Sequence, residues 1–393
     1  MSHILFDLPP LSPDYSGIAS VFHDLGALTI LHDASGCTGT YTGYDEPRWF
    51  GGSSPTFCSG LREMDAIMGE DGKLLEKIKA ALRDITAPCV SVIGSPVPMV
   101  IGFDFKGFAA LVEHETGLPA FGFPANGLHY YDRGQRDAYL AIAERLLEEG
   151  PRKIKRAVNI LGASALDGFD DPSLDALESM LAAGGFSRLA VWGERSSWEE
   201  IKGSAAAEIN WVITAAALPL ARFFEERFGT PFVTGLPIGQ EERERIFSVM
   251  DAYSGGGKPD HLFSPAPGAQ SDPEQKPETV IVGEALFCSS LRASLESSGA
   301  SGPVSIGTFF SQGKAFLRPG DYLFANEDEA REVFSASGLK WLIADPLIKE
   351  LLPIDAAPRF TPLPHRAVSG RLYNEGRARF FDRPKDTPLG TKI

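Results

Sequence analysis

Cysteine thiols are the side chains in this sequence best suited to chemistry. The chain of 393 residues has four of them, Cys37, Cys58, Cys89 and Cys288. Four are too few for a disulfide framework in a chain of this length, and paired thiols are not expected in a reducing cytosol. Since three of the four fall within the first 89 residues, the question is whether these three share one site.

Cys37 lies in a glycine-rich turn, HDASGCTGT, directly after the apolar run ALTIL. That run is typical of a buried strand, and open α/β sheets bind ligands at the carboxyl ends of their strands. Taken alone, Cys37 is also typical of a small buried core thiol, because free cysteine is among the most buried residue types. The turn therefore leaves both interpretations open.

Cys89 and Cys58 make a shared role for the thiols harder to dismiss. Cys89, in TAPCVSVIGS, comes where the helical pattern LLEKIKAALRDI leads into a strand and a glycine turn. Cys58, in GGSSPTFCSGLREMD, falls at the expected start of a helix. Backbone N–H groups and the helix dipole at such a start favour a thiolate.

The spacing of the three thiols favours iron–sulfur chemistry. Intervals of 21 and 31 residues exclude a compact zinc knuckle and a CxxC redox pair. Thiolates without clustered histidines suit an iron–sulfur centre better than zinc or an oxygen-ligated metal. Three sulfurs leave a four-iron cluster one ligand short, so a partner subunit or a non-cysteine ligand belongs to the hypothesis.

Charge and hydropathy exclude several other classes. The net charge of −15 and the pI near 5.0 would repel nucleic acid and anionic membrane surfaces. The sequence shows neither a basic, apolar leader nor a run of 18 apolar residues, and this pattern predicts a cytoplasmic protein with no membrane segment. The stretch GGGK lacks the spacing and the Ser or Thr of a phosphate loop.

The sequence patterns predict alternating strands and helices, and these elements must position the thiols. This alternation predicts an α/β fold with parallel sheets flanked by helices. We expect three units, at residues 1–150, 151–253 and 278–393, with a Gly- and Pro-rich linker at 254–277. The first unit carries Cys37, Cys58 and Cys89, and the segment after Pro358 is expected to be an irregular tail.

Five ordered motifs carry a resemblance to a known family. They are HDASGC, FCSGLREMDAIMGEDGKLLEKI, APCVSVIGS, ETGLPAFGFPANGLHYYDRGQRDAYLAIAERLL and FGTPFVTGLPIG. In this order they resemble the component 1 family of nitrogenase-type oxidoreductases. That family includes the nitrogenase molybdenum-iron subunits, their cofactor-assembly scaffold homologues, dark protochlorophyllide reductase and coenzyme F430 reductase. The resemblance extends over nearly the whole chain.

The resemblance implies a fold, a cofactor and partners. It implies three Rossmann-like domains and an iron–sulfur cluster at a dimer interface, either [4Fe-4S] or a larger cluster like the nitrogenase P-cluster. Electrons would come from an ATP-dependent iron protein, so ATP would act only through that partner. In a homodimer, Cys37 and Cys89 from both chains would supply four thiolates, and Cys58 would raise the number to six. A heterodimer with a paralogous subunit is the alternative.

The chain also departs from the family pattern. The first interface cysteine should fall near Tyr15 and Ser16, where this chain has none. The cysteine that anchors the large cofactor should fall near Thr214, which cannot act as a soft thiolate. His365 matches the region of the second anchoring ligand only loosely, and a structural histidine is the commoner interpretation. Cys288 is expected to be a buried thiol at the start of a helix.

Three further differences bear on partners and substrate. The acid pair that follows Ile-Gly in the family is replaced by Ser95 and Pro96, which puts the docking of a partner in doubt. Arg48 and Arg62 are candidates for holding an anion, but ion pairs with neighbouring acids are the commoner role. Tyr41, Tyr44 and Trp49 would line a cleft or simply pack around the centre.

The main prediction is an enzyme, a nitrogenase-like iron–sulfur oxidoreductase subunit that reduces an unidentified small molecule held between its domains. One alternative is a non-catalytic scaffold or carrier for metallocofactor assembly. The other is a small-molecule binding module that has kept the fold without a cluster. The sequence does not name a substrate.

Overall fold

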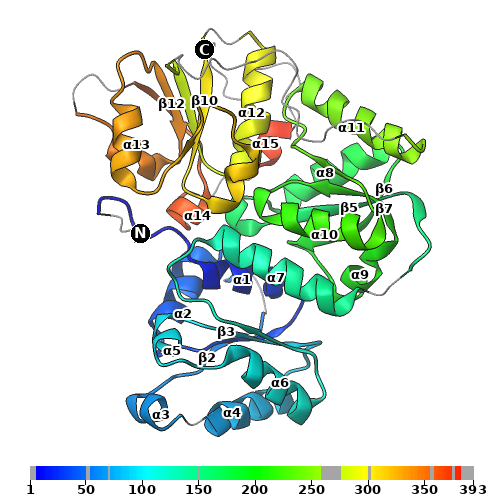
Figure 1. Ribbon diagram of the computed structural model, residues 1–393, viewed down its shortest axis with the longest axis vertical. Coiled ribbons are helices and arrows are strands. Elements are labelled where there is room, and N and C mark those ends of the chain that lie inside the picture. Colours follow the sequence, from blue (N-terminus) through cyan, green and yellow to red (C-terminus); the bar gives the residue numbers. More distant parts are fainter. Residues whose placement is uncertain are drawn as a thin grey trace.

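A computed structural model describes residues 6–49, 54–69, 71–147, 150–257, 276–299, 302–354, 358–373 and 377–381. Each of its three sheets is entirely parallel and is flanked by helices, as the sequence predicts. Figure 1 shows the three sheets in three lobes, with helices α1 and α7 between the lower lobe and the other two. Every helix in the described ranges is too short or too polar to span a bilayer.

The first lobe holds a four-stranded sheet in the order β2-β1-β3-β4. Its elements are α1 (Asp14–His23), β1 (Leu28–Leu31), α2 (Gly36–Thr40), the π-helical turn Tyr41–Asp45, β2 (Thr56–Cys58), α3 (Glu63–Met68), α4 (Asp71–Asp84), β3 (Val90–Ile93), α5 (Pro96–Val100), α6 (Phe105–Thr116), β4 (Ala120–Phe123) and α7 (Tyr131–Leu146). Helix α4 follows the amphipathic pattern read from the sequence, because Leu74, Leu75 and Ile78 are its buried face.

The second lobe holds a four-stranded sheet in the order β6-β5-β7-β8. Its strands and helices are β5 (Ile154–Ala163), α8 (Asp171–Ala183), β6 (Ser187–Gly193), α9 (Trp198–Gly203), β7 (Ala207–Val212), α10 (Leu218–Phe228), β8 (Phe232–Thr234) and α11 (Gln240–Ser254), with short 3₁₀ turns at Ala165–Asp167, Ser204–Ala206 and Ala215–Ala217. Most of the predicted linker at 254–277 lies outside the described residues.

The third lobe holds a five-stranded sheet in the order β11-β10-β9-β12-β13. Its elements are β9 (Thr279–Val282), α12 (Ala285–Ser297), β10 (Val304–Thr308), the 3₁₀ turn Ser311–Phe316, β11 (Tyr322–Leu323), α13 (Glu327–Phe334), β12 (Trp341–Ala344), the 3₁₀ turn Pro346–Leu351, β13 (Arg359–Pro362), α14 (Arg366–Ser369) and α15 (Ala378–Phe381). The segment after Pro358 is therefore not simply irregular. It adds β13 beside β12 and returns α15 to α8 in the second lobe.

Helix α1, which the sequence did not reveal, lies at the centre of the molecule. All ten of its residues are buried, and it packs against α7 at a pair of glycines. A Cβ atom on Gly17 would lie 2.1 Å from the Tyr131 carbonyl oxygen, and one on Gly134 would lie 1.9 Å from that of Asp14. Because glycine has no side chain at either position, the two helices can approach closely. Together they join the first lobe to the other two.

Candidate functional site

The carboxyl ends of β1, β2 and β3 converge at one edge of the first sheet. Leu31 of β1 is level with Cys58 of β2 on one side and with Ile93 of β3 on the other. The chain passes from β1 to β2 on one side of it, and then returns across β1 to β3 on the other side. Such a reversal of strand order is where open α/β sheets bind ligands. We call this region the first-sheet edge, defined by His32, Asp33, Cys37, Cys58 and Ser59.

Asp33, only 3% exposed, fixes the turn that carries Cys37. Its Oδ2 accepts hydrogen bonds from the backbone N–H groups of Ser35 at 3.0 Å and Thr38 at 3.1 Å. Ser95, at the end of β3, donates to the His32 carbonyl oxygen at 3.0 Å. Ser35 adopts a φ of +136°, a backbone conformation that is costly for a residue with a side chain. The buried carboxylate therefore holds a strained turn in one conformation.

Cys37 is half-buried in the short helix α2. Burial and the nearby charge of Asp33 raise the pKa of its thiol, while a hydrogen bond with the Tyr15 hydroxyl opposes that rise. Tyr15 belongs to α1 and is 6% exposed. Tyr15 lies near the position where the family pattern places its first interface cysteine. Its phenol hydroxyl is in direct contact with Cys37.

Cys58 differs in its place from the sequence-based expectation. It is the last residue of β2, while the next helix, α3, begins only at Glu63. Its Sγ donates to the Asp33 carbonyl oxygen at 3.4 Å and accepts from the backbone N–H of Gly60 at 3.3 Å. The helix-dipole argument for a thiolate therefore does not apply, but the half-buried thiol does share Asp33 with the Cys37 turn.

Cys89 lies at the other end of the sheet. It precedes β3, which begins at Val90, and it is fully buried. Because Ile93 is level with Cys58 through Leu31, Cys89 is four residues, or ~13 Å along the strand, away from the first-sheet edge. Burial raises the pKa of its thiol. The structure thus brings Cys37 and Cys58 to one edge and leaves Cys89 in the core at the opposite end.

The carboxyl end of β3 offers no sulfur in place of Cys89. It continues into Ser95 and Pro96, and a Cβ atom on Gly127 would meet both Pro96 and Tyr15 at 3.3 Å. In the described ranges, no three His, Cys, Asp or Glu side chains gather as metal ligands. One chain therefore does not fit an iron–sulfur cluster by itself, and a cluster at this edge would need thiols from a second chain.

The residues at the expected anchoring positions of a large cofactor are engaged by protein groups. Thr214 is buried and donates to the Gly162 carbonyl oxygen at 3.0 Å. Nε2 of His365 lies 3.2 Å from the Tyr131 hydroxyl and from Asp167 Oδ1. Cys288 is fully buried in α12, where burial raises the pKa of its thiol. Of these side chains, His365 joins different lobes, while Thr214 bonds within the second lobe and Cys288 is buried in the third.

A second polar region lies where the three lobes meet, and we call it the junction. It is defined by Arg48, Tyr131, Asp167, Glu194 and His365, all of which are largely or fully buried. The hydroxyl of Tyr131 donates to Asp167, so that α7, the turn after β5 and the segment before α14 share one hydrogen-bonded group. Such a group joins side chains from all three lobes.

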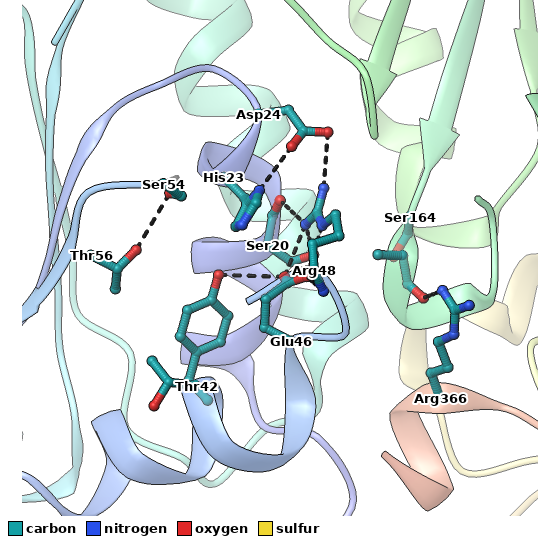
Figure 2. Close-up of polar contacts among 12 residues, drawn as sticks. Ser20, His23, Asp24, Thr42, Glu46, Arg48, Ser54, Thr56, Ser164 and Arg366 are labelled. Atoms are coloured by element: carbon teal, nitrogen blue, oxygen red, sulfur yellow. Dashed lines mark hydrogen bonds and ion pairs between the residues drawn. The ribbon is translucent and has the colours of Figure 1, made fainter. Parts of the chain in front are cut away.

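Arg48 forms several hydrogen bonds and ion pairs within the junction, which Figure 2 shows. Its guanidinium group donates to Glu46 Oε1 at 2.7 Å, Asp24 Oδ2 at 3.1 Å and the Ser20 carbonyl oxygen at 2.9 Å. Burial alone would raise the pKa of Asp24, but bonds from His23 and Arg48 outweigh it and lower the pKa to about 2. Arg48 is therefore the centre of an ion-pair network and not a free anion-binding side chain.

Glu194, at the end of β6, faces this network from the second lobe. Burial raises its pKa to about 8, although the nearby Arg48 opposes the rise. Its Oε2 has no hydrogen-bond partner in the described part of the chain. Sequence reasoning missed Glu194, Asp33 and Tyr15. Asp33 and Glu194 each closely follow a strand, and this is the only local sequence feature that could have indicated a role for them.

Comparisons with known proteins identify the family. The family model for "Nitrogenase component 1 type Oxidoreductase" matches residues 17–281, more than half of the chain. The chain therefore belongs to the nitrogenase component 1 type oxidoreductase family. This confirms the resemblance read from the motifs.

Two curated relatives share the name "Nitrogenase iron-molybdenum cofactor biosynthesis protein NifE". The protein from Klebsiella pneumoniae is 25% identical over 240 residues, which are 56% of this chain and 49% of the relative. The protein from Clostridium pasteurianum is 23% identical over 199 residues, which are 50% of this chain and 43% of the relative. The matches thus span about half the length of these relatives.

Solved structures confirm the fold over nearly the whole chain. "Nitrogenase Cp1 at pH 5" matches with a TM-score of 0.68 and 14% identity, covering 98% of this chain and 89% of that one. "Nitrogenase Cp1 at pH 6.5" matches with a TM-score of 0.59 and 17% identity, covering 91% and 70%. At these identities the likeness establishes the arrangement of the three parallel sheets. The chemistry of the site is argued from the residues of this chain.

Proposed function

We propose that this chain is a carrier or assembly subunit for a metal–sulfur cofactor. Two half-buried thiols at the first-sheet edge, Cys37 and Cys58, are the observation that carries the proposal. The similarity to NifE proteins, whose printed name refers to cofactor biosynthesis, supports an assembly role over a reductase role.

In this proposal the cluster is cargo held between two chains. Cys37 and Cys58 from each copy would supply four thiolates, the number that a four-iron cluster needs. Asp33 would hold the Cys37 turn in place, and the Tyr15 hydroxyl would donate a hydrogen bond to the Cys37 sulfur, which tunes a bound cluster. The cluster itself would supply thiolate-bound iron for transfer.

The first experiment measures iron. Anaerobic purification, iron and sulfide analysis and EPR spectroscopy are expected to find a cluster shared by two chains. Cys37→Ser and Cys58→Ser should each lose most of the iron, while Cys89→Ser and Cys288→Ser serve as matched controls and should retain it. A chain that stays colourless after reconstitution contradicts the proposal and supports a binding module without a cluster.

The second experiment separates a carrier from a reductase. The loaded protein is mixed with an apo acceptor protein, without ATP, and iron transfer is followed by visible absorption after the two proteins are separated. Transfer of most of the iron supports a carrier. Retention of the iron, together with substrate reduction that requires an ATP-dependent iron protein, would instead make the chain a reductase subunit.

A further inference from the structure

A cavity of about 270 Å³ opens at the first-sheet edge, on the side of Ser59. Its walls come from the segments that follow β1, β2 and β3, together with α4. It therefore lies at the reversal of strand order, the position where open α/β sheets bind small molecules. Its volume is close to the lower end of the range for ligand pockets, which limits the ligand to a small molecule.

His32 lines this cavity, and its ring has one nitrogen for which no protein bond is described. The residue is 5% exposed, its ring packs 4.4 Å from that of Phe103, and its Nδ1 lies 2.9 Å from the Ser59 hydroxyl. Its Nε2 forms no hydrogen bond within the described ranges of the chain. Burial lowers the pKa of His32 to about 4, so the ring is neutral at pH 7 and can donate one N–H.

The bonds around Ser59 allow that N–H to be on Nε2. The Ser59 hydroxyl has one proton and two acceptors within reach, the Asp33 carbonyl oxygen at 3.1 Å and His32 Nδ1 at 2.9 Å, and the Cys58 thiol also donates to the Asp33 carbonyl oxygen, at 3.4 Å. With the thiol serving this carbonyl, the Ser59 hydroxyl is free to donate to Nδ1 of His32. The ring proton then lies on Nε2 and points to a ligand acceptor.

The cavity is positive at one end and negative at the other. Lys77 lies near His32, and its Nζ donates to the Ser59 carbonyl oxygen at 2.5 Å. No ion pair of Lys77 is found in the described ranges, although its charge acts on the nearby Asp65, which is paired with Lys73. Asp71 and Asp104 lie at the other end, and burial together with the charge of Asp104 raises the pKa of Asp71. Asp71 and Lys77 are six residues apart on α4, or ~9 Å along its axis.

The remaining wall is apolar or neutralised. Leu74 and Phe103 line the space between the two charged ends. The other lysine of the wall, Lys73, is paired with Asp65 at 2.6 Å. A simple cation or anion would complement only one end, and a metal ion would lack three suitable ligands among the described side chains.

We infer that this cavity binds a small aliphatic zwitterion whose ammonium and carboxylate groups are separated by a methylene chain. The carboxylate accepts from Lys77 and from His32 Nε2, and the ammonium group lies between Asp71 and Asp104. The methylene chain packs along Phe103. None of these ligand-binding residues is a thiol, so the contacts of Lys77, Asp71 and Asp104 do not depend on the proposed cofactor role. The His32 contact does depend on it, because it uses the Cys58 S–H, and it therefore applies to a chain that carries no cluster on Cys58.

Calorimetry on the full chain tests the inference with three probes, 6-aminohexanoate, hexylamine and hexanoate. We expect 6-aminohexanoate to bind about tenfold more tightly than either single-charge probe, because each charged hydrogen bond adds roughly that factor. Lys77→Met should weaken 6-aminohexanoate about tenfold and leave hexylamine nearly unchanged. Asp71→Asn should weaken both probes that carry an ammonium group.

The controls are Lys79→Met and Asp84→Asn, which remove the same charges from α4 outside the cavity. Both should bind 6-aminohexanoate as the wild type does, and circular dichroism verifies that all variants fold. Equal binding of the three probes, absence of binding at millimolar concentration, or an unchanged affinity in Lys77→Met would each overturn the inference. A chain that carries no iron but still selects 6-aminohexanoate would refute only the cofactor role.

Discussion

The junction and the first-sheet edge differ in how their polar groups are bonded, although residues 32–49 contribute to both regions. At the junction, Arg48 has three charged or carbonyl partners from its own chain. At the first-sheet edge, Cys37 and Cys58 are half-buried, and Lys77 and Asp71 face a cavity. At the junction the charge of Arg48 is satisfied within the chain, although Glu194 Oε2 has no partner among the described residues. The first-sheet edge leaves groups available to a ligand or a second chain.

Within residues 32–49, the side chains expected to stabilise the fold therefore differ from those expected to bind a ligand. A buried ion pair is costly to break, because the remaining charge has no water to solvate it. A half-exposed thiol costs little to replace, since water and neighbouring groups compensate. Substitutions at the junction should therefore change unfolding, and those at the edge should change binding.

Arg48→Met should have the largest effect on stability. It leaves Glu46, which is fully buried, without its cation, and we expect the free energy of unfolding to fall by about 3–5 kcal/mol. Urea denaturation measures the change. Arg188→Met, which breaks the half-exposed pair with Glu200, is the control and should cost about 1 kcal/mol or less. Equal losses in the two variants would remove the contrast between junction and surface.

Tyr131→Phe should have the next largest effect. Loss of the hydroxyl leaves Asp167 and His365 short of a hydrogen bond in a buried site, at a cost of about 1–3 kcal/mol. The matched control is Tyr139→Phe on the same helix, because the buried Tyr139 hydroxyl has no hydrogen-bond partner among the described residues. Thermal unfolding should distinguish the two. A Tyr139→Phe variant as unstable as Tyr131→Phe would contradict the role given to the hydrogen bonds.

Glu194→Gln should alter how stability depends on pH. Burial raises the pKa of Glu194 to about 8 from its ordinary value, so the folded chain binds this proton more strongly than the unfolded chain. Its contribution to stability is present below about pH 4.5 and is lost as the pH rises through 8. The variant should therefore be more stable than the wild type at pH 9, by on the order of 1–2 kcal/mol.

Melting temperatures from pH 5 to pH 9 test this difference. Glu199→Gln, which removes an exposed carboxylate from α9, is the control and should keep the wild-type slope. If Glu194→Gln also keeps that slope, Glu194 is already ionised in the folded chain and the charge of the junction is balanced differently.

Cys58→Ser should have the smallest effect on stability, below about 1 kcal/mol, because a half-exposed thiol is replaced by another hydrogen-bonding group. Cys89→Ser puts a hydroxyl into a fully buried site and should cost about 1–3 kcal/mol. Urea denaturation compares the two variants. A larger loss in Cys58→Ser would mean that the first-sheet edge is as tightly built as the junction.

Local sequence patterns predicted most of the fold. The 3.6-residue period of α4 and the apolar runs of β1 and β3 are visible in the chain itself. Helix α1 was not visible, because it is buried on every side and has no polar face to create a period. The strand at Arg359–Pro362 was missed for a related reason, since its pairing with β12 is a contact between distant segments.

The candidate site was predictable only in part. The position of Cys37 after a strand is a local property, and the structure has it there. The separation of Cys89 from Cys37 follows from where β3 begins, one residue after Cys89, and a motif match does not reveal that. The charges of the junction come from segments far apart in the chain, and those of the cavity come from α4 and the later residue Asp104. No local pattern predicts these combinations.

A residue late in the sequence, Arg371, holds the turn that follows the Cys37 helix. Arg371 donates to the carbonyl oxygens of Thr42 and Glu46, at 2.7 and 2.6 Å, across 329 and 325 residues of sequence. Chains are synthesised from the amino terminus, and early domains fold while later ones are still being made. The turn that follows Cys37 therefore acquires this anchor only after Arg371 has been translated, later than the strands of all three sheets. The order of synthesis therefore delays the finished setting of Cys37 until the third lobe has been made.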